Sequence, residues 1–296
     1  MNILLTGSSG FVGKNIITNF SDRFVLTKYA RGTKINIKED IVIHLAGKAH
    51  DLKNVIDQSD YYFANTELTK KVIDAFLSSN AKVFITLSSV KAVADILESE
   101  LTENHLPSPF THYGKSKLLA EQYILSKSIP ESKRVYILRP CMIHGPGNKG
   151  NLNLLYKIVS KGFPWPLGAF ENKRSFCSID NLCFIINELI NNKAIPSGVY
   201  NVADDEPLAT NDLIKLIAES QEKKYHIFNL PKSIIKFLSK WGDFLKLPLN
   251  SERLSKLTET YIVSNNKIIT SINKPLPLSA KEGLMKTLNS FNTNVK

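Results

Sequence analysis

The first half of the chain alternates short apolar runs with longer stretches of helical periodicity. The apolar runs contain few polar residues, as is typical of strands in a parallel sheet covered on both faces. Alternation of such strands with helices predicts right-handed crossovers and a doubly wound sheet. The predicted strands are Asn2–Thr6, Arg23–Tyr29, Asp40–Ala46, Lys82–Ser89 and Arg134–Pro140, with a late strand at Gly198–Asp204. The predicted helices between them include Gly13–Phe20, Tyr61–Ser79 and Tyr113–Ser128.

The second half is punctuated by prolines, and helical patterns such as Asn211–Ser220 dominate it. We therefore predict an α/β chain with two domains. Residues 1–140 and about 176–204 are expected to form the doubly wound parallel sheet, for which the glycine turn described below predicts dinucleotide binding. Residues from about 141 to 175 and from 205 to 296 are expected to form a smaller, mostly helical substrate-binding lid domain.

One helical segment of the second half is both basic and amphipathic, Pro231–Leu247. Such a composition fits a helix lying on a membrane surface. We expect instead a lid helix packed on the protein, with its lysines in water. Trp165 and Trp241 are interpreted in the same way, as residues that pack the lid rather than as stacking platforms for a ligand.

A glycine-rich turn separates the first strand from the first helix. Thr6 to Gly13 reads TGSSGFVG, a G-x-x-G-x-x-G spacing between a predicted strand and a predicted helix. One glycine permits the tight turn, one lets the backbone approach a pyrophosphate, and the third lets helix and strand pack closely. The positive end of the helix then faces the phosphates. The sheet is therefore predicted to be of the Rossmann type, with cofactor contacts at Gly7, Ser9, Gly10, Phe11, Val12 and Gly13.

The end of the second predicted strand bears on which dinucleotide binds. Residues 28–32 read KYARG and contain no carboxylate for the ribose diol of NAD. Arg31 would instead pair with the 2′-phosphate of NADP, so we expect NADP, with NAD as the alternative. Only nine residues separate Arg31 from Ile41, fewer than a complete parallel crossover needs. A third strand, if it is Lys34–Ile37, must therefore be short and connected without a proper helix.

A Tyr-x-x-x-Lys pair, Tyr113 and Lys117, places a phenol and an ammonium on one face of a helix. An isolated phenol has a pKa of about 10 and exchanges protons poorly at neutral pH. A neighbouring ammonium, together with a positive nicotinamide ring, would stabilise the phenolate and lower that pKa. The strand that ends at Ser88 and Ser89 is expected to present a hydroxyl to the cofactor crevice, where it can orient the reacting oxygen.

In this order of motifs the chain resembles the extended short-chain dehydrogenase/reductases, the NAD(P)-dependent nucleotide-sugar epimerase/dehydratase family. The resemblance is specific from Met1 to about Asp204 and looser to about Leu288. It implies a catalytic set of Ser89, Tyr113 and Lys117, acting by hydride transfer at carbon 4 of a nucleotide-linked sugar. The family's 4,6-dehydratases carry Thr-Asp-Glu where this chain reads SVK, so the acid that eliminates water is missing and dehydration is set aside.

The same resemblance assigns further contacts. The segment IHLAG resembles the family's fourth strand, FANTELTK carries its supporting helix asparagine, and LRPCMIHGPG borders the nicotinamide. RSFCSIDNL begins with an arginine similar to one that approaches the substrate diphosphate. Additional cofactor contacts are thereby expected at Leu45, Ala46, Asn65, Ser88 and Pro140, and contacts to a nucleotide-diphosphate sugar at Ser88, Arg174 and Arg253.

Three functions follow. The favoured one is an NADPH-dependent reductase of a nucleotide-linked 4-keto sugar in surface polysaccharide precursor synthesis, because of the catalytic set, Arg31 and the short chain. The second is a UDP-hexose or UDP-N-acetylhexosamine 4-epimerase with tightly bound NAD, which would use the same residues. The third is a non-catalytic dinucleotide-sensing protein, against which the intact Ser89, Tyr113 and Lys117 argue.

The bulk composition adds few constraints. The 296 residues carry a net charge of +11, which fits a lysine-rich surface or an acidic partner. We see no nucleic-acid-binding signature, apolar run of 18 residues or metal motif, so we expect neither nucleic acid, nor a membrane span, nor a metal. Three irregularly spaced cysteines and the lack of a cleavable apolar start fit a reducing cytoplasm. A homodimer is possible. We interpret His44 as hydrogen-bonded in place and His144 as a loop residue.

Overall fold

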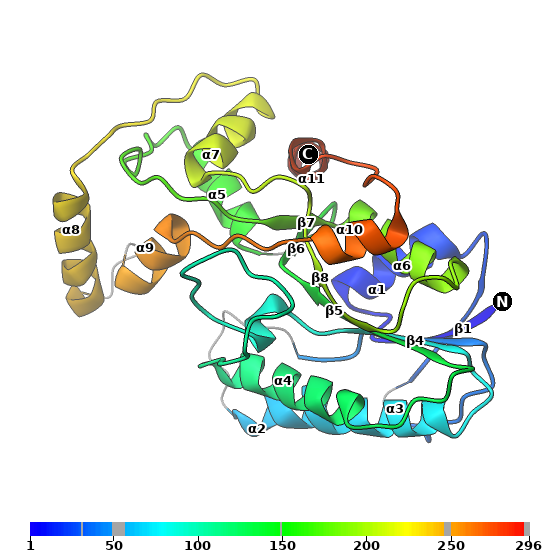
Figure 1. Cartoon of the computed structure of the whole chain (residues 1–296). Helices are drawn as coiled ribbons and strands as arrows, with labels where there is room; N and C mark the ends of the chain where they lie inside the picture. The colour runs from blue at the N-terminus through cyan, green and yellow to red at the C-terminus, as the bar shows by residue number, and fades with distance from the viewer. Residues whose placement is uncertain (31, 49–56, 149, 246–249, 293–296) are drawn as a thin grey trace. The chain divides into compact units, whose positions relative to one another are not determined.

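The apolar runs of the first half form one parallel sheet in the computed structural model, which describes residues 1–30, 32–48, 57–148, 150–245 and 250–292. The strand order is β2-β1-β3-β4-β5-β8, and every neighbouring pair is parallel. Figure 1 labels β1, β4, β5 and β8 of this sheet. Strand β3 is buried at every position, as a strand covered on both faces should be. The Rossmann-type prediction is confirmed. The strands are β1 (Asn2–Thr6), β2 (Val25–Lys28), β3 (Ile41–His44), β4 (Val83–Leu87), β5 (Arg134–Pro140) and β8 (Gly198–Val202).

The additional strand considered at Lys34–Ile37 is not formed, and β2 is the edge strand. The connection from β2 to β3 is too short to carry a crossover helix that would bring another parallel strand to that edge. One residue of this segment, Ile37, still packs in the core beside Leu4 and Val42. The short connection therefore follows the sheet without extending it.

The helices around this sheet follow the predicted periodicity with one irregularity. The stretch predicted as a single helix from Tyr61 to Ser79 begins at Ser59 and passes through a π-helical segment, η1 (Tyr62–Glu67). π-Helical turns are frequent at functional sites. The helical elements are α1 (Phe11–Phe20), α2 (Ser59–Tyr61), η1, α3 (Leu68–Leu77), the 3₁₀ turn η2 (Val90–Ala92), α4 (His112–Leu125), α6 (Ile179–Asn191) and α10 (Asn266–Ile272).

The chain divides into two units whose boundaries differ from the expected ones at residues 176–178 and 204, which belong to the second unit, and at residues 264–277. The first comprises Met1–Cys141, Ile179–Ala203 and Ser264–Pro277; the second comprises Met142–Ser178, Asp204–Val263 and the chain from Leu278. The sequence analysis assigned all of 205–296 to the lid. Ser264–Pro277 belongs to the first unit because its helix α10 packs beside β8 and α6.

The second unit has a two-stranded parallel sheet and a helical majority. Its apolar core includes Val159, Ile214 and Leu288. Trp165 packs there as predicted, 4% exposed, with its indole Nε1 donating to Asn211 Oδ1 at 3.1 Å. The elements are β6 (Met142–His144), β7 (Phe176–Ser178), α5 (Asn151–Ser160), α7 (Thr210–Glu219), α8 (Lys232–Leu245), α9 (Ser251–Thr258) and α11 (Ala280–Asn292).

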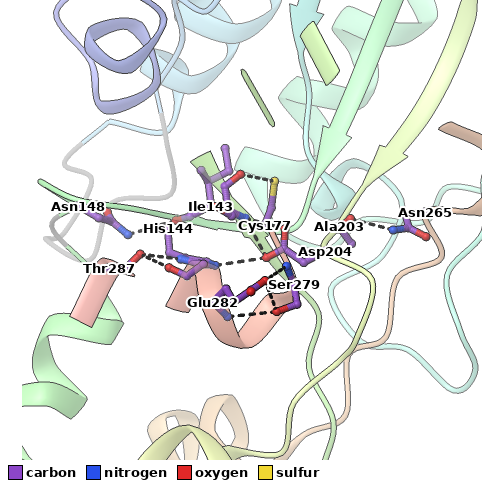
Figure 2. Close-up of polar contacts among 12 residues, drawn as sticks. Ile143, His144, Asn148, Cys177, Ala203, Asp204, Asn265, Ser279, Glu282 and Thr287 are labelled. Carbon is purple, nitrogen blue, oxygen red and sulfur yellow. Dashed lines mark hydrogen bonds and ion pairs between the residues drawn. The ribbon is translucent and has the colours of Figure 1, made fainter. Parts of the chain in front are cut away.

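His144, which the sequence analysis placed in a loop, ends β6 and is fully buried (Figure 2). Its Nδ1 lies 2.9 Å from Thr287 Oγ1, and that hydroxyl donates to the carbonyl of Gly283 at 2.9 Å. Nδ1 must therefore supply the proton of the first bond. The other ring nitrogen, Nε2, lies 3.5 Å from Asp204 Oδ2, and the Asp204 carboxylate accepts from Ser178 N at 2.9 and 3.0 Å. These contacts hold α11 on the β6–β7 sheet.

Candidate active site

The turn between β1 and α1 can be built only with glycine at two positions. Gly7 has a φ of +70°, and a Cβ there would lie 2.6 Å from the backbone nitrogen of Ala46. A Cβ on Gly13 would lie 2.3 Å from the carbonyl oxygen of Gly7, so the third glycine lets α1 pack on the turn. Gly10 is less confined, because the nearest atom to its Cβ would be the same carbonyl oxygen at 3.3 Å.

The surroundings of this turn fit the pyrophosphate of a dinucleotide. Gly10 is the N-cap of α1 and has no side chain that could cap the helix. The helix therefore begins with backbone N–H groups that no N-cap side chain covers, beside the exposed Ser9. Phe11 and Val12 open the helix and are partly buried. A helix N-terminus approached through glycines favours an anion, because its N–H groups and dipole point toward the ligand. Arg31, the predicted NADP contact, lies outside the described residues.

A buried histidine at the end of β3 links the end of β1 to α3, the helix that follows the π-helical segment. His44 Nδ1 lies 2.7 Å from Thr6 Oγ1, and its Nε2 lies 2.9 Å from Thr69 Oγ1. Thr69 donates its own hydroxyl proton to the carbonyl of Asn65 at 2.7 Å, so Nε2 is the donor to Thr69. Burial, reinforced by the charge of Lys117, lowers the pKa of His44 to about 3 and keeps the ring neutral. The prediction that His44 is hydrogen-bonded in place is confirmed.

Asn65 connects the loop after β3 with helix α4. It is 1% exposed, and its Oδ1 accepts from Lys48 N at 2.8 Å. Its Nδ2 donates to Lys48 O at 3.1 Å and to Ser116 Oγ at 3.0 Å. The Ser116 hydroxyl donates in turn to the carbonyl of Tyr113 at 2.8 Å. The side chain therefore positions the first turns of α4, while its predicted contact with the cofactor stays a prediction.

The start of α4 is set by a cap and a close backbone approach. Thr111 is the N-cap, and its hydroxyl accepts from Gly114 N at 3.1 Å. A Cβ on Gly114 would lie 2.3 Å from the carbonyl oxygen of Lys91, so α4 packs directly against η2. This contact brings the first turn of α4, with Tyr113, against the end of β4.

The structure brings the three predicted catalytic residues together. The buried Ser89 hydroxyl forms a hydrogen bond with the Tyr113 phenol and accepts from Lys91 N at 3.2 Å. Lys117 lies one turn beyond Tyr113, and its Nζ donates to the carbonyl of Leu87 at 2.8 Å. Phenol, serine hydroxyl and ammonium thus all converge on the carboxyl end of β4, where a Rossmann-type sheet binds its ligands.

The pKa values of this set differ from the expectation. Burial raises the pKa of Tyr113, more than the hydrogen bond from Ser89 lowers it. Burial also lowers the pKa of Lys117 to about 8, although the charge of Glu121 acts in the opposite direction. The lowered phenol pKa that we expected from Lys117 is therefore not produced by the protein's own groups. The reason is that both side chains lie where either charged form is poorly solvated.

Behind the strand end lies a buried ion pair that the sequence analysis missed. Glu121 is 2% exposed and Arg139 is 5% exposed, and Arg139 Nη2 lies 2.5 Å from Glu121 Oε2. Arg139 Nε also donates to both carboxylate oxygens, at 3.0 and 3.1 Å. The hydroxyl of Ser88 donates to Glu121 Oε1. The available signal was an arginine inside the apolar run of β5 and an acid four residues after Lys117, on the same helix face. The predicted cofactor and substrate contacts of Ser88 remain predictions.

The other predicted residues occupy distinct places. Pro140 ends β5 and is buried opposite Val202 of β8. Arg174 belongs to the second unit, where its guanidinium donates to the carbonyl of Lys256. Arg253 is exposed on α9 of the same unit. Among the residues that the structure describes, no group of three or more histidine, cysteine, aspartate or glutamate side chains is arranged to hold a metal.

A Rossmann-type sheet with a glycine turn, a serine after β4, and a tyrosine and a lysine on α4 together define an NAD(P)-dependent enzyme of the short-chain dehydrogenase/reductase type. The chain belongs to the NAD dependent epimerase/dehydratase family, whose model matches residues 3–203. It is 30% identical over 322 residues to a UDP-glucose 4-epimerase of Vibrio cholerae, covering 98% of this chain and 95% of that protein. It is also 29% identical over 315 residues to an N-acetyl-alpha-D-glucosaminyl-diphospho-ditrans,octacis-undecaprenol 4-epimerase of Escherichia coli O157:H7, covering 97% and 94%.

A solved structure agrees with the fold. The UDP-glucuronic acid 4-epimerase of Bacillus cereus in complex with NAD superposes with a TM-score of 0.75 over 100% of both chains, at 19% sequence identity. Family and fold together establish an NAD-dependent enzyme of the nucleotide-sugar epimerase, dehydratase and reductase group. None of the helices in the described ranges is long and apolar enough to cross a membrane.

Proposed function

We propose that the chain is a 4-epimerase of a hexose or N-acetylhexosamine carried on a diphosphate, with NAD as its cofactor. The observation that carries this proposal is the hydrogen bond between Ser89 and Tyr113 at the end of β4, with Lys117 anchored on the same strand end. Similarity to two 4-epimerases over nearly the whole chain supports carbon 4 as the reacting centre.

The proposed roles follow from the chemistry of each group. NAD, when bound at the glycine turn, supplies a nicotinamide that accepts and returns a hydride. Ser89 orients the sugar oxygen by a hydrogen bond, and Tyr113 exchanges the proton of that oxygen. The raised pKa of the buried Tyr113 keeps the phenol protonated and ready to donate to a carbonyl oxygen. For Tyr113 to accept a proton, its phenolate must be stabilised by positive charge nearby. The Lys117 ammonium is the group placed to contribute that charge.

The diphosphate is the part of the substrate that we assign to the second unit. Arg174 and Arg253 are the guanidinium groups proposed to bind it, because bidentate hydrogen bonds favour arginine for phosphate. The carrier beyond the diphosphate is either a nucleoside or a polyprenol, since one relative acts on UDP-glucose and another on a diphospho-undecaprenol.

The alternative is the NADPH-dependent 4-keto-sugar reductase that the sequence analysis favoured. It depends on Arg31, and Arg31→Ala should weaken NADP binding and barely affect NAD binding, measured by titration of both dinucleotides. Equal weakening of both would remove the argument for NADP.

A single assay separates these functions. One portion of the purified chain is denatured to identify any bound dinucleotide. A second, native portion is incubated with UDP-glucose, UDP-N-acetylglucosamine and N-acetylglucosaminyl-diphospho-undecaprenol, each with and without added NAD, and with a nucleotide-linked 4-keto sugar and NADPH. An epimerase yields the 4-epimer, seen by NMR, without net consumption of NAD. Stoichiometric loss of NADPH on a 4-keto sugar would establish the reductase instead. The matched control is Tyr113→Phe. A wild type that binds a dinucleotide but converts none of these substrates would favour the non-catalytic dinucleotide-sensing protein.

A further inference from the structure

Helix α8 packs on the protein through a narrow stripe of buried residues. Only Ile235, Ser239 and Gly242 of this helix are buried, and they repeat at the three- and four-residue spacing of one helix face. Through them α8 packs beside α9. The expectation of a lid helix packed on the protein, with its lysines in water, is therefore right for this stripe and for the exposed lysines.

A wide apolar arc of α8 faces away from that stripe. At about 100° per residue, its side chains cover about 120° of the helix circumference. The Phe237 and Trp241 rings lie against each other with centroids 6.0 Å apart. Trp241 is thus no packing residue of the second unit's core, contrary to the sequence-based interpretation. The arc consists of Ile234 (49% exposed), Phe237 (60%), Leu238 (48%), Trp241 (52%), Phe244 (82%) and Leu245 (54%).

The remaining face of α8, between the apolar arc and the buried stripe, is basic. It carries Lys232, Lys236 and Lys240, all exposed. None of these lysines enters the ion pairs found in the described part of the chain. The one acid of the helix, Asp243, accepts from Ser251 N at 2.9 Å and from Ser251 Oγ at 2.5 Å, so its charge is turned toward α9. The exposed surface of the helix is therefore apolar on one side and positive on the other.

We propose that α8 binds the surface of an anionic phospholipid bilayer, with the helix axis in the plane of the interface. Its aromatic and aliphatic arc would lie at the boundary between headgroups and acyl chains, which is where amphipathic helices bury such faces. Lys240 adjoins that arc, and Lys236 and Lys232 follow it around the helix toward the buried stripe, where Lys232 Nζ lies 5.9 Å from the centroid of the Phe170 ring. Lysines on the polar face of such a helix are attracted to anionic headgroups near the surface. A hydrophobic groove on a partner protein would cover the apolar arc, but it would not account for the row of lysines beside it.

Lipid binding by α8 would determine where the enzyme works. It is measured without turnover, so the test of lipid binding is independent of the proposed function. Each lysine held near an anionic surface strengthens binding by about fivefold, so three contribute about a hundredfold. The apolar arc contributes to binding on any bilayer. Loss of the lysines should therefore weaken binding to anionic vesicles in particular, whereas loss of the apolar arc should weaken binding to every vesicle.

The experiment uses the full-length chain and vesicles of phosphatidylglycerol and phosphatidylethanolamine, compared with vesicles of phosphatidylcholine alone. Binding is measured by flotation, and insertion by the emission of Trp241, since Trp165 is buried. We expect binding to the anionic vesicles with a blue shift of the emission, and much weaker binding to the neutral ones. Trp241→Phe should bind while losing the shift.

Two variants and their matched controls test the two halves of the surface. Lys232→Gln/Lys236→Gln/Lys240→Gln should weaken binding to anionic vesicles by about a hundredfold. Its control, Lys34→Gln/Lys38→Gln/Lys82→Gln, removes the same charge from exposed sites of the first unit and should bind like the wild type. Phe237→Ser/Phe244→Ser should abolish the remaining binding, whereas Leu106→Ser, at a site 91% exposed, should not.

The outcomes that overturn the proposal are distinct. Wild-type binding by the α8 lysine variant, or by Phe237→Ser/Phe244→Ser, would show that the chain meets lipid elsewhere. The wild type could instead fail to bind vesicles and form a dimer in light scattering. If Phe237→Ser/Phe244→Ser dissociated that dimer, the apolar arc would be the interface with a second copy of the chain. Activity on water-soluble UDP-sugars should be unchanged in all these variants, and this keeps failure of the lipid proposal separate from failure of the proposed function.

Discussion

Replacing Glu121 by glutamine should destabilise the first unit and disturb helix α4, which carries Tyr113 and Lys117, through one buried contact. Glu121 lies on the same face of α4 as Lys117 and Tyr113, and it is fixed from the sheet side by Arg139. The substitution keeps the shape of the side chain but removes the charge that compensates a guanidinium only 5% exposed.

The magnitude follows from what is left behind. Removing one partner of a buried ion pair costs about 3–5 kcal/mol, because the other charge stays buried without compensation. Glutamine retains one oxygen that can still accept from Arg139, so we expect the lower end, about 3 kcal/mol. Replacing both charges, in Glu121→Leu/Arg139→Met, should restore stability to within about 1 kcal/mol of the wild type. The remaining loss of stability comes from the Ser88 hydroxyl, which no longer has the Glu121 carboxylate as its hydrogen-bond acceptor.

The assay is urea unfolding followed by circular dichroism at pH 7, with Glu100→Gln, an exposed site, as the matched control. The control should change the free energy of unfolding by no more than about 0.5 kcal/mol. A second readout is the pH dependence of activity. Because Glu121 raises the pKa of Lys117, its neutralisation should move the alkaline limb of the activity profile to lower pH.

Two results would refute the reasoning. If Glu121→Gln were no less stable than the exposed control, the pair would not be a buried ion pair. If the double variant were destabilised by as much as the single one, packing rather than uncompensated charge would explain the loss.

Three further predictions concern the predicted site. Tyr113→Phe should lower kcat by about 10²–10⁴ while NAD affinity, measured by titration, stays unchanged; an active variant would remove Tyr113 from the chemistry. Lys117 has a pKa of about 8 when folded, against 10.5 in its ordinary state, so the unfolded chain binds more protons between these values. The free energy of unfolding that this group contributes should therefore rise by about 1 kcal/mol from pH 7 to pH 9. Urea unfolding at both pH values should show the rise in the wild type and not in Lys117→Met. Gly13→Ala should destabilise the chain by about 1–3 kcal/mol, because its Cβ meets the Gly7 carbonyl. Gly10→Ala should leave stability near the wild type and weaken NAD binding alone; thermal melting with and without NAD compares the two.

The parts predicted correctly are those encoded over short distances in the chain. Burial on both faces makes β3 a continuous apolar run, whatever it pairs with. The glycine turn needs only a strand, a helix and the spacing between them. Tyr113 and Lys117 share a face because of the helical repeat alone, and Ser89 follows because parallel strands end at one edge of the sheet.

The parts that were missed depend on partners distant in sequence. Glu121 and Arg139 are 18 residues apart, and their burial together depends on how α4 lies on β5. His144 was interpreted as a loop residue because its partner Thr287 is 143 residues away. The pKa of Tyr113 moves opposite to the expectation because local spacing identifies a neighbouring ammonium but not the depth of burial.

The sequence by itself determined the succession of strands and helices, the glycine turn, and the spacing that places Tyr113 and Lys117 on one helix face, since each is a local pattern in the chain. Only the tertiary structure decided what covers each apolar face. The period of α8 marks it as amphipathic in either case, yet its packed stripe is Ile235, Ser239 and Gly242, while its largest apolar side chains face outward. Hydrophobic periodicity states that a helix face is apolar; whether protein, lipid or a second copy meets that face is a property of surfaces that exist only after folding.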